Sequence, residues 1–270
     1  MGSRVYLLLT LGLYTVGVLH VLVQALARKR FLAGATIGAT LMGFALQTAY
    51  LSLRWSEAGH FPVVGLHDGA CFLAWAIVLV YLLTYVVTRV DALGLLVHPV
   101  AFGLILTAAL APLSEREDPI LKSLFLPIHT TLAFFGYAAL FVAFGMGLLY
   151  LVQERGLKSR TPNRFYYLAP SLERCDTISG RSVAVGFGFL TLAIVTGMLW
   201  SHSAKGLYWS GSAKEWSAVI AWVIYVVLLL ARQRSGWGGR QAALLGVAGF
   251  SVVLFTFVWM TVIQPPGVTP

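Results

Sequence analysis

The sequence predicts an all-α protein that crosses a membrane about eight times, as a single transmembrane domain over residues 1–270. Three observations predict this fold. Hydrophobic residues make up 59% of the chain and charged residues only 11%, whereas soluble domains are about a quarter charged. The apolar residues fall in runs of about 20, the length of a helix that spans a bilayer. Backbone groups find no water inside lipid, so each run is expected to be helical.

The first four spans are separated by short polar segments. Basic residues at 28–30 end the first span on the cytoplasmic side, and a tight turn from Arg89 to Asp91 follows the third. Gly59, Pro62 and Gly65 interrupt any helix between the second and third spans. These four spans are expected at about residues 5–27, 31–53, 69–88 and 92–112.

The last four spans follow an acidic segment at 112–125, which is expected to be a solvated external loop. The largest cytoplasmic segment is expected at 153–181, because Pro162, Pro170 and Gly180 break a helix there. Glycines in the sixth span, such as Gly186 and Gly188, allow close approach of a neighbouring helix. These four spans are expected at about residues 126–152, 182–200, 216–232 and 241–263.

The positive charge of this chain follows the membrane topology. The formal net charge is +9, but the basic residues gather in alternate loops, which is the positive-inside pattern and excludes a nucleic-acid partner. The pattern puts both termini and the segment 200–222 outside the cytoplasm. Of the 19 Lys and Arg residues, six fall on the external side: Arg4, Arg54, Arg116, Lys122, Lys205 and Lys214.

The two cysteines are expected to be free thiols. Cys71 begins the third span near the outer face, and Cys175 lies in the expected cytoplasmic segment. Bridged cysteines have Cα atoms within about 7 Å of each other, so these two cannot pair across the membrane.

The segment 200–222 is expected to be a tryptophan-rich external loop. Two interpretations stay open: a belt of rings that anchors helix ends at the membrane surface, and a flat platform for a planar ligand. The aromatic residues of this segment are Trp200, Tyr208, Trp209, Trp216 and Trp222.

The order of residues from Gly206 to Trp216, followed by a helix that ends in Ala231-Arg232, resembles the cytochrome c assembly family of CcsA, ResC and CcmC-like haem-handling proteins. That family reads close to G-x-Y-W-S-W-D-P-K-E-T-W and then H-A-R. The positions that match are Tyr208, Trp209, Ser210, Lys214 and Glu215. Three positions depart: Gly211 for the second Trp, Ser212 for the Asp, and Leu230 for the His.

The resemblance extends to two other segments and implies haem as the cofactor. The run Gly59-His60-Phe61-Pro62 resembles the family's loop before its third helix, and Pro127-Ile-His129 resembles the segment that carries the external axial histidine. The implied haem site has His129 as an axial iron ligand. The other implied haem-site residues are Tyr208, Trp209 and Trp216 against the ring, Lys214 with Lys205 or Arg54 at the propionates, and His202, His60 or His67 as a second ligand.

A second pair of histidines lies within the membrane spans. His20 precedes Arg28 by 8 residues and His98 follows Arg89 by 9, so both lie about 12–13 Å above the cytoplasmic edge. Two intramembrane histidines at one depth suggest a haem or proton-relay site. Equal depth does not make their helices neighbours, so two separately satisfied polar groups remain the alternative.

Three functions remain open. The resemblance implies a protein of the bacterial cytoplasmic (inner) membrane that holds haem at the outer face for apocytochrome c, together with a partner membrane subunit of the CcsB/ResB type. The departures at Gly211, Ser212 and Leu230 favour an accessory, HemX-like protein without transfer activity. A small-solute transporter ranks last, because no span carries a midplane charge. No independent catalytic motif is present, so enzymatic activity is left open.

Overall fold

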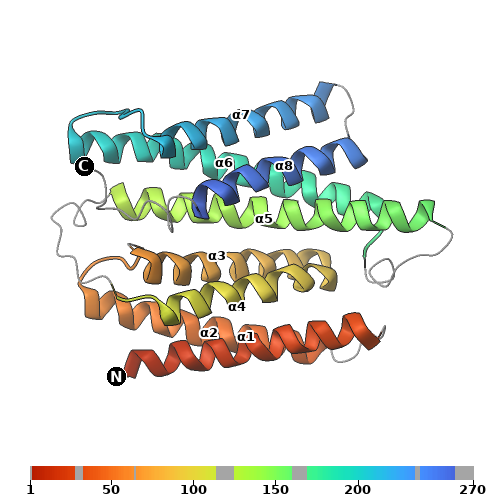
Figure 1. Cartoon of the computed structure of the whole chain (residues 1–270), viewed down its shortest axis with the longest axis horizontal. Coiled ribbons are helices and arrows are strands. Elements are labelled where there is room, and N and C mark those ends of the chain that lie inside the picture. The colour runs from red at the N-terminus through yellow and green to blue at the C-terminus, as the bar shows by residue number, and fades with distance from the viewer. Residues whose placement is uncertain are drawn as a thin grey trace. The chain divides into compact units, whose positions relative to one another are not determined.

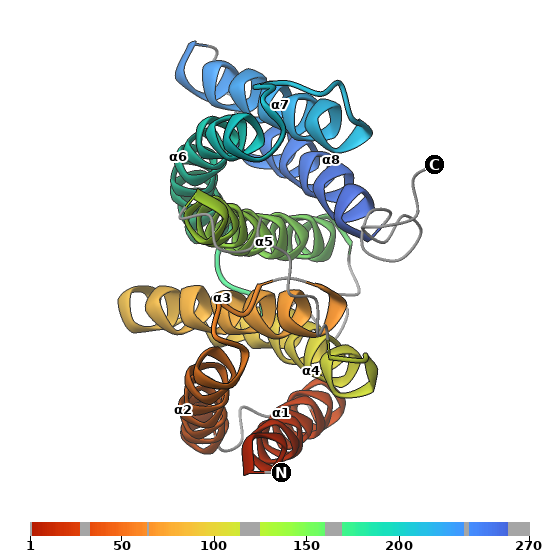
Figure 2. The ribbon, with the colours of Figure 1, turned by 90° about the vertical axis from the view of Figure 1, so that its left-hand side faces the viewer.

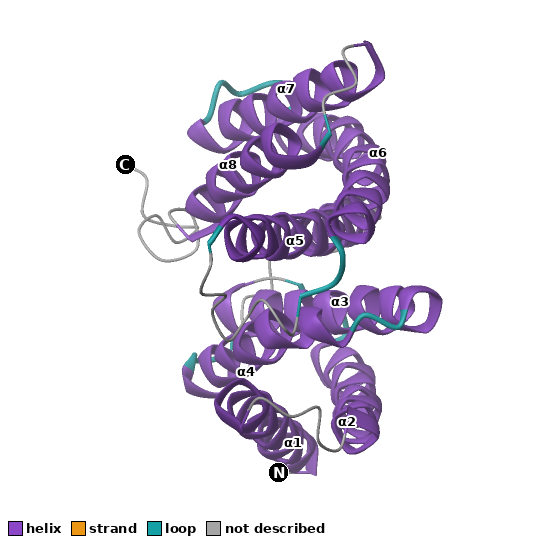
Figure 3. Cartoon of the chain, turned by 90° about the vertical axis from the view of Figure 1, so that its right-hand side faces the viewer, coloured by secondary structure: helices purple, strands orange, loops and turns teal. Residues whose placement is uncertain are grey.

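The computed structural model describes residues 2–27, 33–63, 65–113, 125–159, 169–234 and 238–258. All regular structure in these ranges is helical (Figure 3), which confirms the expected all-α fold and its eight long helices. The basic residues at 28–30, nearly all of the acidic segment and the C-terminal tail lie outside the described residues. The long helices are α1 Gly2–Ala27, α2 Ala33–Ala58, α3 Gly65–Thr88, α4 Gly94–Leu110, α5 Phe125–Lys158, α6 Leu172–Lys205, α7 Ala213–Arg234 and α8 Gly239–Val258, with a short 3-10 turn η1 at Asp91–Leu93 before α4.

Six of the described helices are long and apolar enough to cross a membrane, and the protein is a multi-pass membrane protein. The apolar part of α8 is shorter, at Gly239–Phe255. The more polar α2 does not reach the same hydropathy, although its length matches that of α1.

The chain divides into two compact units, which are described separately. The first unit comprises Met1–Glu115 with Arg155–Pro170 and contains α1 to α4, coloured red to yellow in Figure 1. The second comprises Arg116–Glu154 with Ser171–Pro270 and contains most of α5 and all of α6 to α8, coloured green to blue. In the first unit, α1 lies along α2 and α4, and α3 lies along α4 (Figure 2).

A stripe of buried polar residues along α2 holds the first unit together. Its members are Thr36, Thr40, Gln47 and Arg54, each less than a tenth exposed. At 100° per residue, the spacings of 4, 7 and 7 return these side chains to nearly one face of the helix. The polar groups of α2 therefore point into the unit and not into lipid, which explains how a helix of low hydropathy can sit among apolar ones.

Each member of the α2 polar stripe bonds to a neighbouring helix. Thr36 bonds to the ring of His20 on α1, and the Gln47 amide nitrogen donates to the Cys71 carbonyl on α3 at 2.9 Å. The Arg54 guanidinium donates to the Asp68 carboxylate on α3 at 3.2 Å. Hydrogen bonds of this kind add specificity to helix packing in lipid, where apolar contacts distinguish partners poorly.

The second unit is built around a close approach of α5 and α6. A Cβ atom at Gly136 would lie 3.3 Å from the Leu190 backbone nitrogen, and one at Gly186 would lie 2.7 Å from the Leu140 side chain. The expected role of Gly186 in close packing is confirmed. Gly188, in contrast, faces open space.

The helices α6, α7 and α8 are joined at one end by a single carboxylate. Asp176 Oδ1 accepts hydrogen bonds from Arg232 Nη2 at 2.7 Å and from the Gly239 backbone nitrogen at 3.1 Å. Gly180 gives the guanidinium its room, because a Cβ there would lie 3.0 Å from Nη2. One side chain on α6 thus fixes both the end of α7 and the start of α8.

We expect Asp176→Ala to lower the free energy of unfolding by about 1–3 kcal/mol, because it leaves the Arg232 guanidinium without its charged partner. Thermal unfolding of the purified protein in detergent measures this loss. Glu173→Ala is the matched control, since this carboxylate is exposed in the first turn of the same helix. Equal melting temperatures for the two variants would contradict the prediction.

Several helices are longer than the sequence pattern predicted. The helix α6 begins at Leu172, because the Ser171 side chain accepts a hydrogen bond from the Arg174 backbone nitrogen and caps it. The expected cytoplasmic segment at 153–181 is therefore partly helical, and Gly180 does not break it. Because α3 begins at Gly65, His67 and Asp68 are buried helical residues and not loop residues. Both cysteines are free, as expected. Cys175 is a buried residue of α6 and does not lie in a loop.

Candidate functional site

His129 lies in the first turns of α5 and is held by α6. Its Nδ1 lies 2.7 Å from the carbonyl oxygen of Ala193. A carbonyl can only accept, so Nδ1 carries the proton and Nε2 carries the lone pair. No described residue donates to or accepts from Nε2. This is the arrangement of a histidine prepared to bind a metal through Nε2, with its other nitrogen fixed by a carbonyl.

Two further residues of α6 shape the space around this imidazole. A Cβ atom at Gly197 would lie 2.8 Å from the Cε1 and 2.9 Å from the Nδ1 of His129. Trp200 lies one turn further along, with its ring parallel to the imidazole at 6.5 Å and an interplanar angle of 2°. Its buried Nε1 has no hydrogen-bond partner among the described residues. The stripe of Ala193, Gly197 and Trp200 therefore forms one wall of the site.

The irregular part of the tryptophan-rich segment is short. The helix α6 continues through Lys205 and ends at Gly206, which takes the left-handed conformation with φ 72°. The next helix, α7, begins at Ala213. Only the seven residues 206–212 between these helices are non-helical, so the expected loop at 200–222 consists largely of two helix ends.

A capping box ends this loop. The Ser212 hydroxyl accepts from the Glu215 backbone nitrogen at 3.4 Å, and the Glu215 carboxylate accepts in return from the Ser212 backbone nitrogen at 3.2 Å. The carboxylate also accepts from the backbone nitrogen and hydroxyl of Ser210, both at 2.9 Å. Ser and Asp are equally good at the first position of such a cap, so Ser212 can cap α7 although the family pattern has Asp at this position.

We expect Glu215→Ala to loosen the loop by about 1 kcal/mol, because three donors at Ser210 and Ser212 lose their acceptor. The amide hydrogens of Ser210 and Ser212 should then exchange about fivefold faster. Hydrogen exchange followed by mass spectrometry measures the rate. Ser217→Ala is the control, since that hydroxyl donates only to the Lys214 carbonyl. An unchanged rate in Glu215→Ala would refute the capping role.

The aromatic rings of the loop pair with one another. Tyr208 stacks on His202 with ring centres 4.1 Å apart, and Trp209 meets Trp216 edge to face at 5.5 Å. Tyr208 and Trp216 remain 52% and 55% exposed. Much aromatic surface is thus presented outward, and a ligand could cover it.

Basic groups lie near the imidazole. The ammonium of Lys214 is close enough to His129 to interact with it electrostatically, and Lys205 is similarly close to Lys214. An imidazole with a cation nearby suits a haem, because the imidazole can bind the iron and the cation can meet a propionate. These residues all belong to the second unit.

The candidate second ligands are not equivalent. His202 follows Gly197 by five residues on α6, which turns it about 140° away from the face that holds His129. Among the described residues, His60 makes one hydrogen bond, between its Nδ1 and the carbonyl oxygen of its neighbour Phe61 at 3.1 Å. His67 has both nitrogens engaged, with Nδ1 donating to the Ala108 carbonyl and Nε2 accepting from the Tyr50 hydroxyl. His67 could bind iron only by breaking one of these bonds.

The intramembrane histidines lie against one face of α2. His20 bonds to Thr36, while His98 Nε2 lies 2.9 Å from the hydroxyl of Thr40, one turn along. His98 Nδ1 also bonds to the Gly94 carbonyl at 2.8 Å. With both nitrogens of His98 engaged, the geometry favours two separately satisfied polar groups over a shared iron. Arg54, a candidate for the propionates, is paired with Asp68 in the same unit.

Sequence reasoning missed the α6 wall. Ala193 acts through its backbone, which no side-chain motif reveals, and Gly197 is one of several glycines in the predicted sixth span. Trp200 was grouped with the loop rings although it is helical. One signal was available: the spacing of these residues, i, i+4 and i+7, places them on one face of a helix.

The fold and the site together define a class: a multi-pass helical membrane protein with a half-buried imidazole beside an aromatic, basic surface. Comparison with known proteins defines the family. The sequence profile described as cytochrome C assembly protein matches residues 63–264, most of the chain. This chain therefore belongs to the cytochrome c assembly protein family.

Individual relatives agree with this. A protein of Synechococcus sp. (strain CC9902) named cytochrome c biogenesis protein CcsA is 33% identical over 239 residues, which cover 79% of each chain. The protein of the same name from Chlamydomonas reinhardtii is 30% identical over 262 residues, covering 94% of this chain and 71% of the relative. Among solved structures, cytochrome c heme lyase CcmF matches with a TM-score of 0.66 over 96% of this chain and 49% of its own. At 16% identity this likeness shows a shared fold.

Proposed function

We propose that this protein handles haem in cytochrome c maturation, holding it at the outer membrane face for delivery to an apocytochrome c. The observation that carries the proposal is the His129 imidazole, whose Nδ1–H is fixed by the Ala193 carbonyl and whose Nε2 lone pair has no partner among the described residues. Family membership supports the role in cytochrome c maturation, since a family profile and relatives named for that process match most of the chain.

Other residues of the second unit are suited to the rest of a haem. The exposed rings of Tyr208 and Trp216 supply flat apolar surface, with Trp209 packed edge to face against Trp216. Lys214, together with Lys205, supplies cations for the propionates. Haem brings the iron that an imidazole can bind; the protein supplies the fixed nitrogen, the aromatic surface and the charge.

The proposal has one axial ligand to the haem iron, His129. His202 remains the candidate second ligand nearest to the loop, six residues before Tyr208, but it would have to reach around the end of α6. A single axial ligand also suits a protein that must release its haem to an apocytochrome c. The proposed partners are haem, apocytochrome c and a membrane subunit of the CcsB/ResB type, and the proposed location is the bacterial inner membrane with the loop outside.

Deletion of the gene tests the proposed function. Cells without it should lose covalently bound c-type haem, seen by haem staining of denatured protein gels, while their b-type cytochromes persist. A plasmid copy of the wild-type gene should restore the staining. Normal c-type haem in the deletion strain would refute the proposal.

One observation favours an accessory, HemX-like role without transfer. The family's membrane histidine is replaced by Leu230, which is 44% exposed on α7, so α7 offers no imidazole there. Under this alternative the purified protein is colourless even from haem-replete cells. Absorption spectroscopy of the purified protein therefore distinguishes the two functions.

A further inference from the structure

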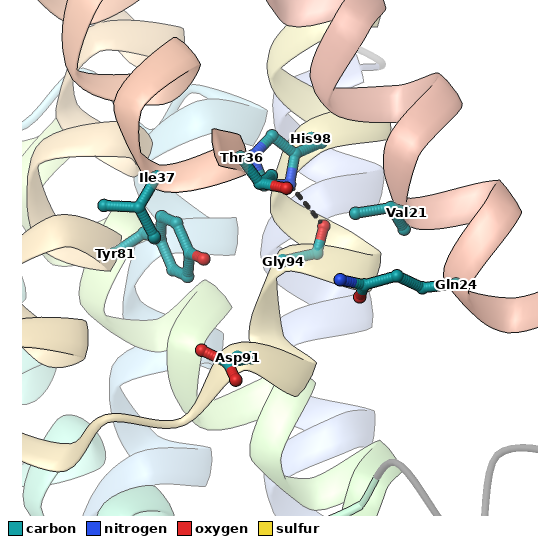
Figure 4. A pocket seen from close by; sticks show the side chains of 8 residues that line it. All are labelled: Val21, Gln24, Thr36, Ile37, Tyr81, Asp91, Gly94 and His98. Atoms are coloured by element: carbon teal, nitrogen blue, oxygen red, sulfur yellow. Dashed lines mark hydrogen bonds between the residues drawn. The ribbon is translucent and has the colours of Figure 1, made fainter. Parts of the chain in front are cut away.

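A small polar cavity lies within the first unit, among α1, α2, α3, η1 and α4 (Figure 4). Its volume is about 20 Å³, which is sufficient for one water molecule. Polar side chains make up most of its lining, which is unusual inside a bundle of apolar helices. The lining residues are Val21, Gln24, Thr36, Ile37, Tyr81, Asp91, Gly94 and His98.

The residues that line the cavity are half-buried at one end and almost fully buried at the other. Asp91 and Gln24 are half-buried, at the end of the helices where α3 gives way to α4. Tyr81 and His98 are each only 2% exposed. In Figure 4 the Asp91 carboxylate and the His98 ring lie at opposite ends of the group. The cavity thus connects a carboxylate near the helix ends with an imidazole deep inside the unit.

His98 is bonded in a way that suits two protonation states. Its Nδ1–H donates to the Gly94 carbonyl at 2.8 Å, and its Nε2 lies 2.9 Å from the Thr40 hydroxyl oxygen. The same hydroxyl lies 2.7 Å from the Thr36 carbonyl. The single hydroxyl hydrogen of Thr40 therefore has two acceptors to choose between.

Each orientation of the Thr40 hydroxyl suits one protonation state of the His98 imidazole. When His98 is neutral, Thr40 donates its hydrogen to Nε2. When a proton binds to Nε2, the Thr40 hydroxyl turns its hydrogen to the Thr36 carbonyl and accepts the new N–H. In both forms the imidazole keeps a hydrogen bond at each of its two nitrogens, so neither state leaves a ring nitrogen unpaired.

The surroundings of His98 also fit a proton site. Two glycines give the ring its place: a Cβ at Gly17 would lie 2.5 Å from its Cδ2, and one at Gly94 would lie 3.1 Å from its Cε1. The titratable groups around it are His20 from α1, Tyr81 from α3, which meets the ring edge-on at 5.8 Å, and Asp91 from η1. The helix α2 contributes threonine hydroxyls.

We propose that this cavity holds a water molecule and that, together with His98, it forms a proton-binding site served from the side on which Asp91 lies. The proton arrives through the water and adds to Nε2 of the neutral imidazole, while the Asp91 carboxylate offsets the new positive charge. No bond other than N–H is formed, and the Thr40 hydrogen only turns. This site is separate from the haem residues of the second unit and does not depend on them.

Nitrogen-15 NMR of histidine-labelled protein in lipid nanodiscs tests the proposal, since neutral and protonated imidazoles have distinct shifts. The chain has six histidines, and His98→Gln identifies the signal by its loss. Between about pH 9 and about pH 5, the His98 signal should change from the neutral Nδ1–H form to the imidazolium form. A signal that stays neutral over this whole range would overturn the proposal.

Two variants test the mechanism. Thr40→Val removes the hydroxyl that accepts the new N–H, and Asp91→Asn removes the offsetting charge. Each should lower the pH of half-protonation by about one unit, because a charge-assisted interaction is lost. Thr84→Val is the control, since the Thr84 hydroxyl makes the same bond to the carbonyl four residues earlier, on α3. If Thr40→Val titrates like the wild type, the hydroxyl has no part in proton binding and the proposal fails.

Discussion

Replacement of His129 by alanine is expected to remove haem from the purified protein almost completely. The imidazole presents an Nε2 lone pair, because its Nδ1–H donates to the Ala193 carbonyl and fixes the ring. Without it, aromatic and cationic contacts alone would retain haem weakly, so we expect the Soret absorbance per protein to fall about tenfold or more. Spectra of equal amounts of wild type and variant, purified from haem-replete cells, measure the effect.

His202→Ala is the matched control for this experiment. His202 lies near the same end of the second unit, but it stacks on Tyr208 and has turned away from the face that holds His129. We expect this variant to keep more than half of its haem. The assignment would be refuted if His202→Ala lost its Soret band while His129→Ala kept it.

Gly197→Ala is expected to produce nearly the same loss without removing any haem-binding group. The added methyl would lie 2.8 Å from Cε1 of His129, well inside van der Waals contact, so the ring must leave its place beside Ala193. Loss of the hydrogen bond from His129 Nδ1 to the Ala193 carbonyl should lower haem affinity by about 10- to 100-fold. Titration of haem into the apoprotein measures the affinity.

The same helix provides the control. A Cβ at Gly188 meets nothing within 4 Å, and alanine is a better helix former than glycine. Gly188→Ala should therefore bind haem like the wild type and unfold at the same temperature or slightly higher. Equal haem affinity for Gly197→Ala and Gly188→Ala would show that the position of His129 does not matter.

Much of the fold could be predicted from the sequence, because runs of apolar residues directly reflect burial in lipid. The eight helices lie where these runs lie, and errors are confined to their ends. The sequence predicts the start of α6 about ten residues too late, because it suggests that Gly180 breaks the helix, whereas Gly180 makes room for the Arg232 guanidinium. Helix ends depend on caps such as Ser171, which are weaker signals than a run of 20 apolar residues. The division into two compact units has no counterpart in the hydrophobic pattern.

The site could be predicted only in part. His129 was found through its family motif, but the group that fixes its tautomer is the backbone of Ala193, and a backbone carbonyl leaves no trace in a sequence. The polar residues of α2 were overlooked for a different reason. Thr36, Thr40 and Gln47 are scattered singly through an apolar span, and only their common face relates them to one another.

The α2 polar stripe has a consequence for biosynthesis. If α2 entered the bilayer with α1 alone, its Arg54 guanidinium and Gln47 amide nitrogen would lack their partners on α3, which is synthesised later, and would face hydrocarbon. We therefore expect the newly synthesised α2 to remain at the translocon until α3 and α4 have been synthesised, and to move into the bilayer together with them. Truncation of the chain after residue 63 should then leave α2 exposed to a protease or to thiol labelling from water, whereas truncation after residue 113 should protect it.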